Sequence, residues 1–133
     1  MQIKKVVVIG SGTMGSGIAA QLCNANIPVT LLDLKTEISE KAREKIFKSR
    51  PPLLIDKSKI ENIKVGNIID DFKIVKEADW IVEAVVERID IKHNIYEKIF
   101  KNRKKGAIVS SNTSSIPIKV LSEKLSNEEK KDF

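Results

Sequence analysis

The chain has 133 residues, a length that fits one domain with a hydrophobic core of its own. Its single cysteine, Cys23, excludes a disulfide framework, and its single histidine, His93, excludes a metal centre built on several histidines, so we expect no metal site. Lysine and arginine outnumber aspartate and glutamate by 24 to 18. The resulting net charge of +6 favours anionic partners such as nucleotides, coenzyme A or RNA.

Residues 6–32 carry no charge, yet they do not fit a membrane-spanning helix. Such a helix needs about 20 predominantly apolar residues, and this stretch is interrupted by glycines, Gln21, Asn24, Asn26 and Pro28. The apolar run that starts at Val6 stops at Gly10, short of the roughly 7–15 residues of a signal-peptide core. We therefore predict a soluble, cytoplasmic protein with no membrane partner.

The first half of the chain alternates apolar strands with amphipathic helices. We expect strands at 3–9 and 28–33 and helices at 14–26 and 36–49. Met14, Ile18 and Leu22 share the buried side of the first helix, where Cys23 is a core residue. The prolines at 51 and 52 end the second helix, because proline lacks the backbone N–H that a helix needs.

The second half continues the alternation. We expect a loop or short helix at 53–61, a strand at 62–65 and a helical turn at 70–76. A strand at 80–86 is followed by a helix that Asp90 caps and that ends near 102. After a strand at 107–110, Pro117 opens a last helix, which has Ile118, Leu121 and Leu125 on one side. This alternation predicts an α/β fold of the Rossmann type, with a doubly wound parallel sheet in the order 3-2-1-4-5.

A glycine pattern joins the first strand to the first helix. Gly10-Ser11-Gly12-Thr13-Met14-Gly15 matches G-x-G-x-x-G, follows a buried strand and opens an amphipathic helix. Gly10 permits a tight turn, Gly12 lets the backbone approach a pyrophosphate, and Gly15 lets the helix pack close to the sheet. The helix N-terminus adds unpaired amides and a partial positive charge. We predict that residues 10–15 hold the phosphates of a dinucleotide.

An acidic residue completes this pattern. Asp33 lies 18 residues after Gly15, at the end of the second strand. There it would accept hydrogen bonds from the adenosine ribose and repel a 2′-phosphate, which favours NAD over NADP, although Lys35 close by weakens that preference. The alternative is a glycine-rich turn without a ligand. The complete context favours the dinucleotide.

Ligands of a doubly wound sheet bind where the strand order reverses. Segment 84–87 ends the fourth strand and segment 112–115 follows the fifth, so both should face the nicotinamide. Lys92 falls inside the apolar arc of its helix, so we expect its amine to leave that arc and reach the crevice near Glu87; a snorkelling lysine without a ligand is an equal alternative. The polar run 110–115 is either a turn that caps the next helix or a set of hydroxyls aimed at a substrate oxygen. His93 lies beyond the arc and is more consistent with a surface residue than with a base.

Four segments, in the same order along nearly the whole chain, resemble the NAD-binding domain of L-3-hydroxyacyl-CoA dehydrogenases. They are VVVIGSGTMGSGIAA, LLDL, ADWIVEAVVERIDIKHNIYEKI and IVSSNTSSIPI. The run KSRPPLLID is similar to the subgroup in which the dehydrogenase is fused to an enoyl-CoA hydratase. That family oxidises a 3-hydroxyacyl-CoA to the 3-ketoacyl-CoA in fatty-acid β-oxidation, and a histidine paired with a glutamate takes the hydroxyl proton as hydride passes to NAD.

The resemblance implies a role for each matching residue. Residues 10–15 and Asp33 would hold the adenosine diphosphate part of NAD. The nicotinamide ribose would be lined by Ala84, Glu87 and Lys92, with Asn112 beside it. Ser114 would touch the cofactor and donate a hydrogen bond to the 3-oxygen of the substrate.

The sequence departs from the family at its end. In that family the catalytic histidine lies in an H-F-F-N-P-like segment on the strand after the last helix, whereas this chain stops at Lys131-Asp132-Phe133. We expect a truncated domain without the sixth strand, the base, its glutamate and the helical C-terminal domain. An acyl-CoA would then be a partner only together with that missing domain.

Two other functions compete with this interpretation. The first is a stand-alone NAD-binding or sensing module without turnover. The second is an RNA-binding protein that uses the positive charge, but the aromatic content of 5% provides no stacking platform, so we expect no nucleic-acid partner.

The missing sixth strand has a further consequence. The fifth strand, 107–110, should form an exposed edge of the sheet. Because exposed edges pair with strands of other chains, we predict a homodimer through this edge.

Overall fold

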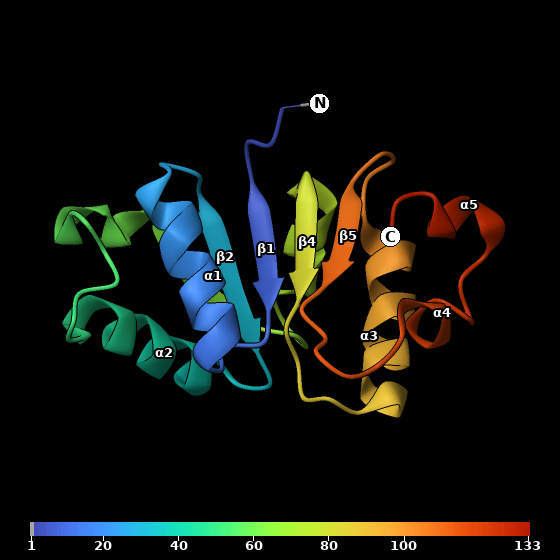
Figure 1. Cartoon of the computed structure of the whole chain (residues 1–133). Coiled ribbons are helices and arrows are strands. Elements are labelled where there is room, and N and C mark those ends of the chain that lie inside the picture. The colour runs from blue at the N-terminus through green and yellow to red at the C-terminus, as the bar shows by residue number, and fades with distance from the viewer. Residues whose placement is uncertain (1) are drawn as a thin grey trace.

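The computed structural model describes residues 2–133 and contains one five-stranded parallel sheet (Figure 1). Its strands are β1 (Val6–Ile9), β2 (Val29–Asp33), β3 (Ile63–Asn67), β4 (Trp80–Glu83) and β5 (Ile108–Ser111). Their order is β3-β2-β1-β4-β5, which confirms the predicted topology. The order reverses at β1, so the expected ligand crevice lies between β1 and β4.

The register brings the carboxyl ends of the strands to one end of the sheet. Ile9 is paired with Leu32 on one side and with Glu83 on the other, and Glu83 is paired with Ser111. Every loop that follows a strand therefore starts at the same place. We call this place the carboxyl end of the sheet.

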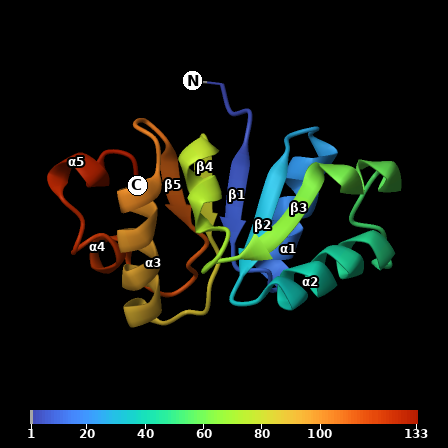
Figure 2. The ribbon, with the colours of Figure 1, turned by 180° about the vertical axis from the view of Figure 1, so that it is seen from behind.

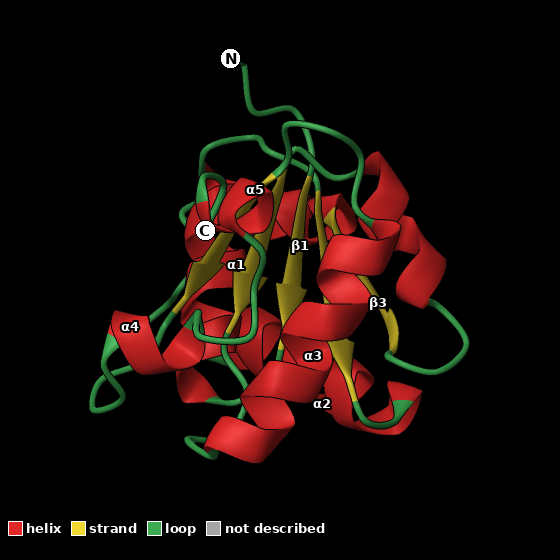
Figure 3. Cartoon of the chain, turned by 90° about the vertical axis from the view of Figure 1, so that its right-hand side faces the viewer, coloured by secondary structure: helices red, strands yellow, loops and turns green. Residues whose placement is uncertain are grey.

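Helices cover both faces of the sheet (Figures 1–3). The helical elements are α1 (Thr13–Asn24), α2 (Thr36–Lys48), η1 (Lys57–Asn62), η2 (Phe72–Glu77), α3 (Ile89–Asn102), α4 (Ile118–Leu121) and α5 (Asn127–Lys130), of which η1 and η2 are 3-10 helices. Val6 and Val8 pack with α1 and α2, whereas Val7 and Ile9 pack with η2 and α3. This alternation along β1 explains its continuous run of β-branched residues.

Two helix ends follow from local chemistry. Asn26 adopts a φ of +63° after α1, and the N–H of Ile27 returns to the carbonyl of Leu22 at 3.0 Å, which is the pattern of a Schellman cap. Helix α2 ends at Lys48, just before the prolines, as predicted. Met14 differs from the prediction, because its side chain is 60% exposed and does not join the core.

Several predicted boundaries are wrong: β1 begins at Val6 instead of residue 3, and further differences concern β4, α3 and the last helix. Strand β4 ends at Glu83 instead of residue 86, because the carboxylate of Glu83 accepts the N–H of Val85 and turns the chain away. The N-cap of α3 is Arg88, so Asp90 lies in the first turn, where its charge suits the helix dipole. The predicted last helix is two short helices, α4 and α5, and Leu125 lies between them.

The outer edge of β5 is covered in part, contrary to the expected bare edge. The N–H of Val109 donates to the carbonyl of Asp132 at 2.8 Å, and Arg103 bonds both the carbonyl of Ala107 at 2.9 Å and the carboxylate of Asp132 at 2.7 Å. The ring of Phe133 packs edge-on against Tyr96. The carbonyl of Asp132 therefore occupies an outward-facing donor of this strand.

No helix within residues 2–133 is long and apolar enough to cross a membrane. The cytoplasmic location stays a prediction.

Candidate functional site

The glycine loop at the end of β1 is packed too tightly for any other residue at two positions. Gly10 has a φ of +108°, and a Cβ added there would lie 2.3 Å from the carbonyl oxygen of Ala84. A Cβ on Gly15 would lie 1.8 Å from the carbonyl oxygen of Gly10. Both glycines thus let α1, the loop and the end of β4 touch, which places Ala84 beside Gly10.

Gly12 has the opposite surroundings. No atom lies within 4 Å of a Cβ built on it, so the backbone there faces open space. Gly12 is also the N-cap of α1, and among the described residues no side chain caps this helix or places an acid in its first turn. Uncapped amides beside open space fit an incoming phosphate group.

Asp33 connects the end of β2 to this loop. Its Oδ2 accepts the backbone N–H of Ser11 at 2.8 Å and the hydroxyl of Ser11 at 2.5 Å. Its Oδ1 accepts the N–H of Leu34 at 2.7 Å and keeps acceptor capacity for a further donor such as a ribose hydroxyl. Asp33 therefore also orients the glycine loop, a role that the sequence pattern does not predict.

Four exposed apolar side chains surround the carboxyl end of the sheet. Their exposed fractions are 60% for Met14, 66% for Leu34, 78% for Ile69 and 61% for Val86. Exposed apolar groups gathered near one site are typical of a surface that contacts a ligand. Met14 and Val86 lie in segments that the sequence predicted to line the site, whereas Leu34 and Ile69 were not predicted; they follow the ends of β2 and β3, and that position is the signal in the sequence.

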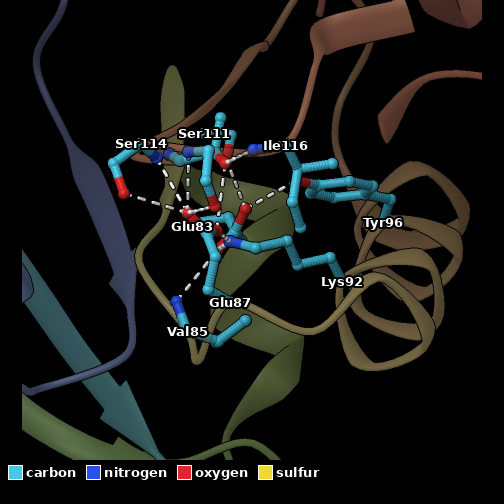
Figure 4. A network of polar contacts seen from close by, with 10 residues as sticks. Glu83, Val85, Glu87, Lys92, Tyr96, Ser111, Ser114 and Ile116 are labelled. Carbon is cyan, nitrogen blue, oxygen red and sulfur yellow. Dashed lines mark hydrogen bonds and ion pairs between the residues drawn. The ribbon is translucent and has the colours of Figure 1, made fainter. Parts of the chain in front are cut away.

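A buried ionic network occupies the second half of the site, between β4, α3 and β5 (Figure 4). Its centre is Glu83, whose Oε2 accepts Lys92 Nζ at 2.6 Å and whose Oε1 accepts the hydroxyls of Tyr96 at 2.5 Å and Ser111 at 2.6 Å. Burial, and then the hydrogen bond to Glu83, raise the pKa of Tyr96, which stays neutral. We call Glu83, Glu87, Lys92, Tyr96 and Ser111 the Glu83 network.

Glu83 is a residue of the site that the sequence patterns did not predict. The available signal was a carboxylate inside the otherwise apolar run Trp80–Val86. A charge is expensive to bury unless it is paired, so a glutamate in a buried strand indicates a specific partner elsewhere in the fold.

Lys92 differs from its predicted state. Its side chain is only 1% exposed, and its ammonium bridges the carboxylates of Glu83 and Glu87, the latter at 3.1 Å. It does lie beside Glu87 as predicted, but it does not leave the apolar arc for solvent.

Glu87 holds the loop of residues 113–115, which we call the Ser114 loop. One oxygen accepts the hydroxyl of Thr113 at 3.0 Å, and the other accepts the backbone N–H groups of Ser114 at 2.8 Å and Ser115 at 3.2 Å. The amide of Ser114 is the largest cause that holds the pKa of Glu87 well below its ordinary value, and Lys92 adds to it. Glu87 is therefore ionised throughout the neutral range.

The remaining predicted residues lie as follows. The backbone N–H of Asn112 donates to the carbonyl of Glu83 at 2.8 Å, so Asn112 stands at the carboxyl end of the sheet. The hydroxyl of Ser114 donates to Glu87 at 3.2 Å. His93 is partly buried, and its Nε2 is 3.0 Å from the carbonyl oxygen of Val120 in α4. Cys23 is a buried core residue, as predicted, and burial raises its pKa.

The geometry can be set beside known proteins. The family model described as "3-hydroxyacyl-CoA dehydrogenase, NAD binding domain" matches residues 5–132. This chain belongs to that family. NAD is accordingly the cofactor of this NAD-binding domain, and the expected resemblance is confirmed.

Curated relatives are longer than this domain. A probable 3-hydroxyacyl-CoA dehydrogenase of Deinococcus radiodurans is 46% identical over 125 residues, which are 89% of this chain and 36% of the relative. A putative fatty acid oxidation complex trifunctional enzyme of Rickettsia felis is 41% identical over 139 aligned residues, covering 99% of this chain and 19% of the relative. The domain thus spans about a third or less of either relative.

Solved structures show the same fold. The 3-hydroxybutyryl-CoA dehydrogenase of Escherichia coli superposes with a TM-score of 0.83 at 26% identity, over 96% of this domain and 28% of that chain. The dehydrogenase part of a multifunctional enzyme of C. elegans has a TM-score of 0.77 at 28% identity, over 96% of this domain and 30% of that chain.

Proposed function

We propose that this domain binds NAD along the carboxyl end of its sheet and supplies the cofactor half of a 3-hydroxyacyl-CoA dehydrogenase. Residues 10–15 would hold the pyrophosphate and Asp33 the adenosine ribose. Ala84, Glu87, Lys92 and Asn112 would surround the nicotinamide ribose, with Lys92 acting from its buried position beside Glu87.

One observation carries this proposal. The open space over Gly12 lies at the uncapped N-terminus of α1, next to an aspartate that is hydrogen-bonded to the same loop. We expect a phosphate and the ribose joined to it to bind these two neighbouring groups.

The reaction assigns a role to Ser114. Bound NAD would accept a hydride from C3 of a 3-hydroxyacyl-CoA, and the hydroxyl of Ser114 would turn from Glu87 to hydrogen-bond the 3-oxygen. The proton of the substrate hydroxyl needs a base. His93 does not suit this task, because its Nε2 is engaged with Val120, so we propose that the base and the rest of the acyl-CoA site belong to a further segment or domain.

Association through β5 belongs to the same proposal. A second copy that pairs with this edge would have to displace the carbonyl of Asp132 from Val109. We therefore expect a weaker homodimer than a bare edge would form.

A titration with reduced cofactors tests the binding site. We expect NADH to bind in the micromolar range and more tightly than NADPH. Asp33→Ala should weaken the binding of NADH by about 1–3 kcal/mol, since hydrogen-bond donors lose a charged partner. It should also reduce the ratio by which the domain prefers NADH over NADPH. Nicotinamide fluorescence measures both affinities.

Ser11→Ala is the matched control, because it removes one hydrogen bond to Asp33 but keeps the carboxylate. It should preserve the preference for NADH. An Asp33→Ala variant that binds NADH as tightly as the unaltered domain would refute the role of Asp33, and an unaltered domain that binds no NADH would refute the proposed function.

A further inference from the structure

Glu83 has no capacity left for a ligand. A carboxylate offers about four acceptor positions, and those of Glu83 take Lys92 Nζ, the N–H of Val85 at 2.9 Å, and the hydroxyls of Tyr96 and Ser111 (Figure 4). Its side chain is also completely buried. Any influence of Glu83 on the site must therefore pass through these neighbours.

Two chains of contacts lead from Glu83 to the Ser114 loop. In the first, Lys92 bridges Glu83 and Glu87, and Glu87 accepts the amides of Ser114 and Ser115. In the second, the hydroxyl of Ser111 donates to Glu83 and accepts the N–H of Thr113 at 3.1 Å. One buried carboxylate thus contacts two separate segments on the β4 side of the crevice, the connection from β4 to α3 and the end of β5.

In the first chain of contacts, electrostatics makes the position of each charged group depend on the group before it. A buried ammonium is stable only where carboxylates compensate it, so the position of Lys92 Nζ follows from the position of Glu83. Lys92 in turn lies between two carboxylates that would otherwise repel each other. Glu87 is one-third exposed, and it keeps its orientation because Lys92 and the hydroxyl of Thr113 contact its Oε1 while the amides of Ser114 and Ser115 donate to its Oε2.

We propose that Glu83 is a positioning residue: through Lys92 and Ser111 it holds Glu87 and the Ser114 loop in the geometry that receives cofactor and substrate. This rests on the proposed function for what the loop contacts, whereas the positioning itself is a property of the unliganded domain.

The test uses Glu83→Gln and the double variant Glu83→Gln/Lys92→Met. The double variant removes both buried charges, so it folds without an unpaired ion, but it cannot orient Glu87. We expect the amide proton resonances of Ser114 and Ser115 to move upfield, the pKa of Glu87 to rise toward its ordinary value, and the NADH dissociation constant to increase roughly tenfold, as for coupled residues in one network. NMR of the unliganded domain gives the first two readouts and fluorescence the third.

Ser39→Ala is the matched control. It removes a fully buried hydroxyl whose hydrogen bond of 2.8 Å joins α2 to the carbonyl of Gly66, on the other half of the sheet. It should lower the melting temperature and leave all three readouts at the values of the unaltered domain. If neither Glu83 variant folds, Ser111→Ala interrupts the second chain without leaving a charge unpaired and should shift the amide resonances of Thr113 and Ser114.

Unchanged amide resonances and an unchanged pKa of Glu87 in a folded variant would overturn the proposal. The proposed function and the positioning role of Glu83 can be refuted independently of each other. An unaltered domain that does not bind NADH refutes the proposed function, while the amide and pKa readouts still decide whether Glu83 positions the loop.

Discussion

At the residue scale, two glycines of α1 differ in whether the fold leaves space for a Cβ. Gly15 is buried, and a Cβ there would meet the carbonyl of Gly10, which is backbone and cannot move aside. Gly17 lies two residues further along the same helix, and nothing is found within 4 Å of a Cβ built on it. Only the first of them is needed for the close approach of helix and loop.

Replacing these two glycines by alanine should therefore change the stability of the domain in opposite directions. Gly17→Ala should raise the free energy of unfolding by about 0.5–1 kcal/mol, because alanine loses less backbone entropy in a helix. Gly15→Ala should lower it by about 1–3 kcal/mol through overpacking and should also weaken NADH binding. Urea denaturation of the two variants measures both changes. Equal effects of the two substitutions would contradict the packing of the loop.

At the element scale, the outer edge of β5 depends on Arg103. Its side chain is mostly buried and joins the carbonyl of Ala107 to the carboxylate of Asp132, whose own carbonyl accepts the N–H of Val109. A strand edge with an occupied donor is a poorer template for another strand. We therefore expect Arg103 to limit self-association through β5.

Arg103→Ala should expose this edge. We expect the variant to show a larger mean mass than the unaltered domain in light scattering at the same concentration, because the segment that covers Val109 loses its attachment. Lys101→Ala is the control, since Lys101 makes only an exposed ion pair with Glu97 on the same helix and such pairs contribute little. Identical masses for Arg103→Ala and the control would contradict the prediction.

At the scale of the whole molecule, binding and chemistry are separable. The groups expected to contact NAD lie at one end of one sheet, joined by contacts from Asp33 through Ser11 and Gly10 to Ala84 and Glu83. The one histidine of the chain is engaged with Val120. We therefore expect the domain to orient a cofactor and a substrate oxygen, and we expect the base to come from another segment.

Turnover should therefore need a second polypeptide segment. With acetoacetyl-CoA and NADH, we expect the isolated domain to bind NADH but to oxidise it at least ~10²-fold more slowly than an intact dehydrogenase, the lower limit for a missing general base. Loss of substrate positioning should slow it further. Adding a polypeptide that carries the histidine, its glutamate and the helical domain should restore the rate, followed by absorbance. A rate near that of an intact enzyme in the domain alone would refute this.

The strand order, the glycine loop and the place of Asp33 follow from the amino-acid sequence alone. These features depend on neighbours in the chain: a run of β-branched residues, a turn that only glycine permits, and an acid at the end of the next strand. The same local patterns are sufficient to place residues 10–15, Ala84 and Glu87 at one end of the sheet.

The state of Lys92, the importance of Glu83 and the covering of β5 depend instead on the tertiary structure. Periodicity places Lys92 on an apolar arc, but it does not reveal that a carboxylate nine residues earlier, on another element, holds its ammonium at 2.6 Å. Likewise, nothing in the local pattern of β5 shows that the carbonyl of Asp132 returns to Val109. Such pairs form because folding brings distant elements together and because a buried charge or donor must find a partner there.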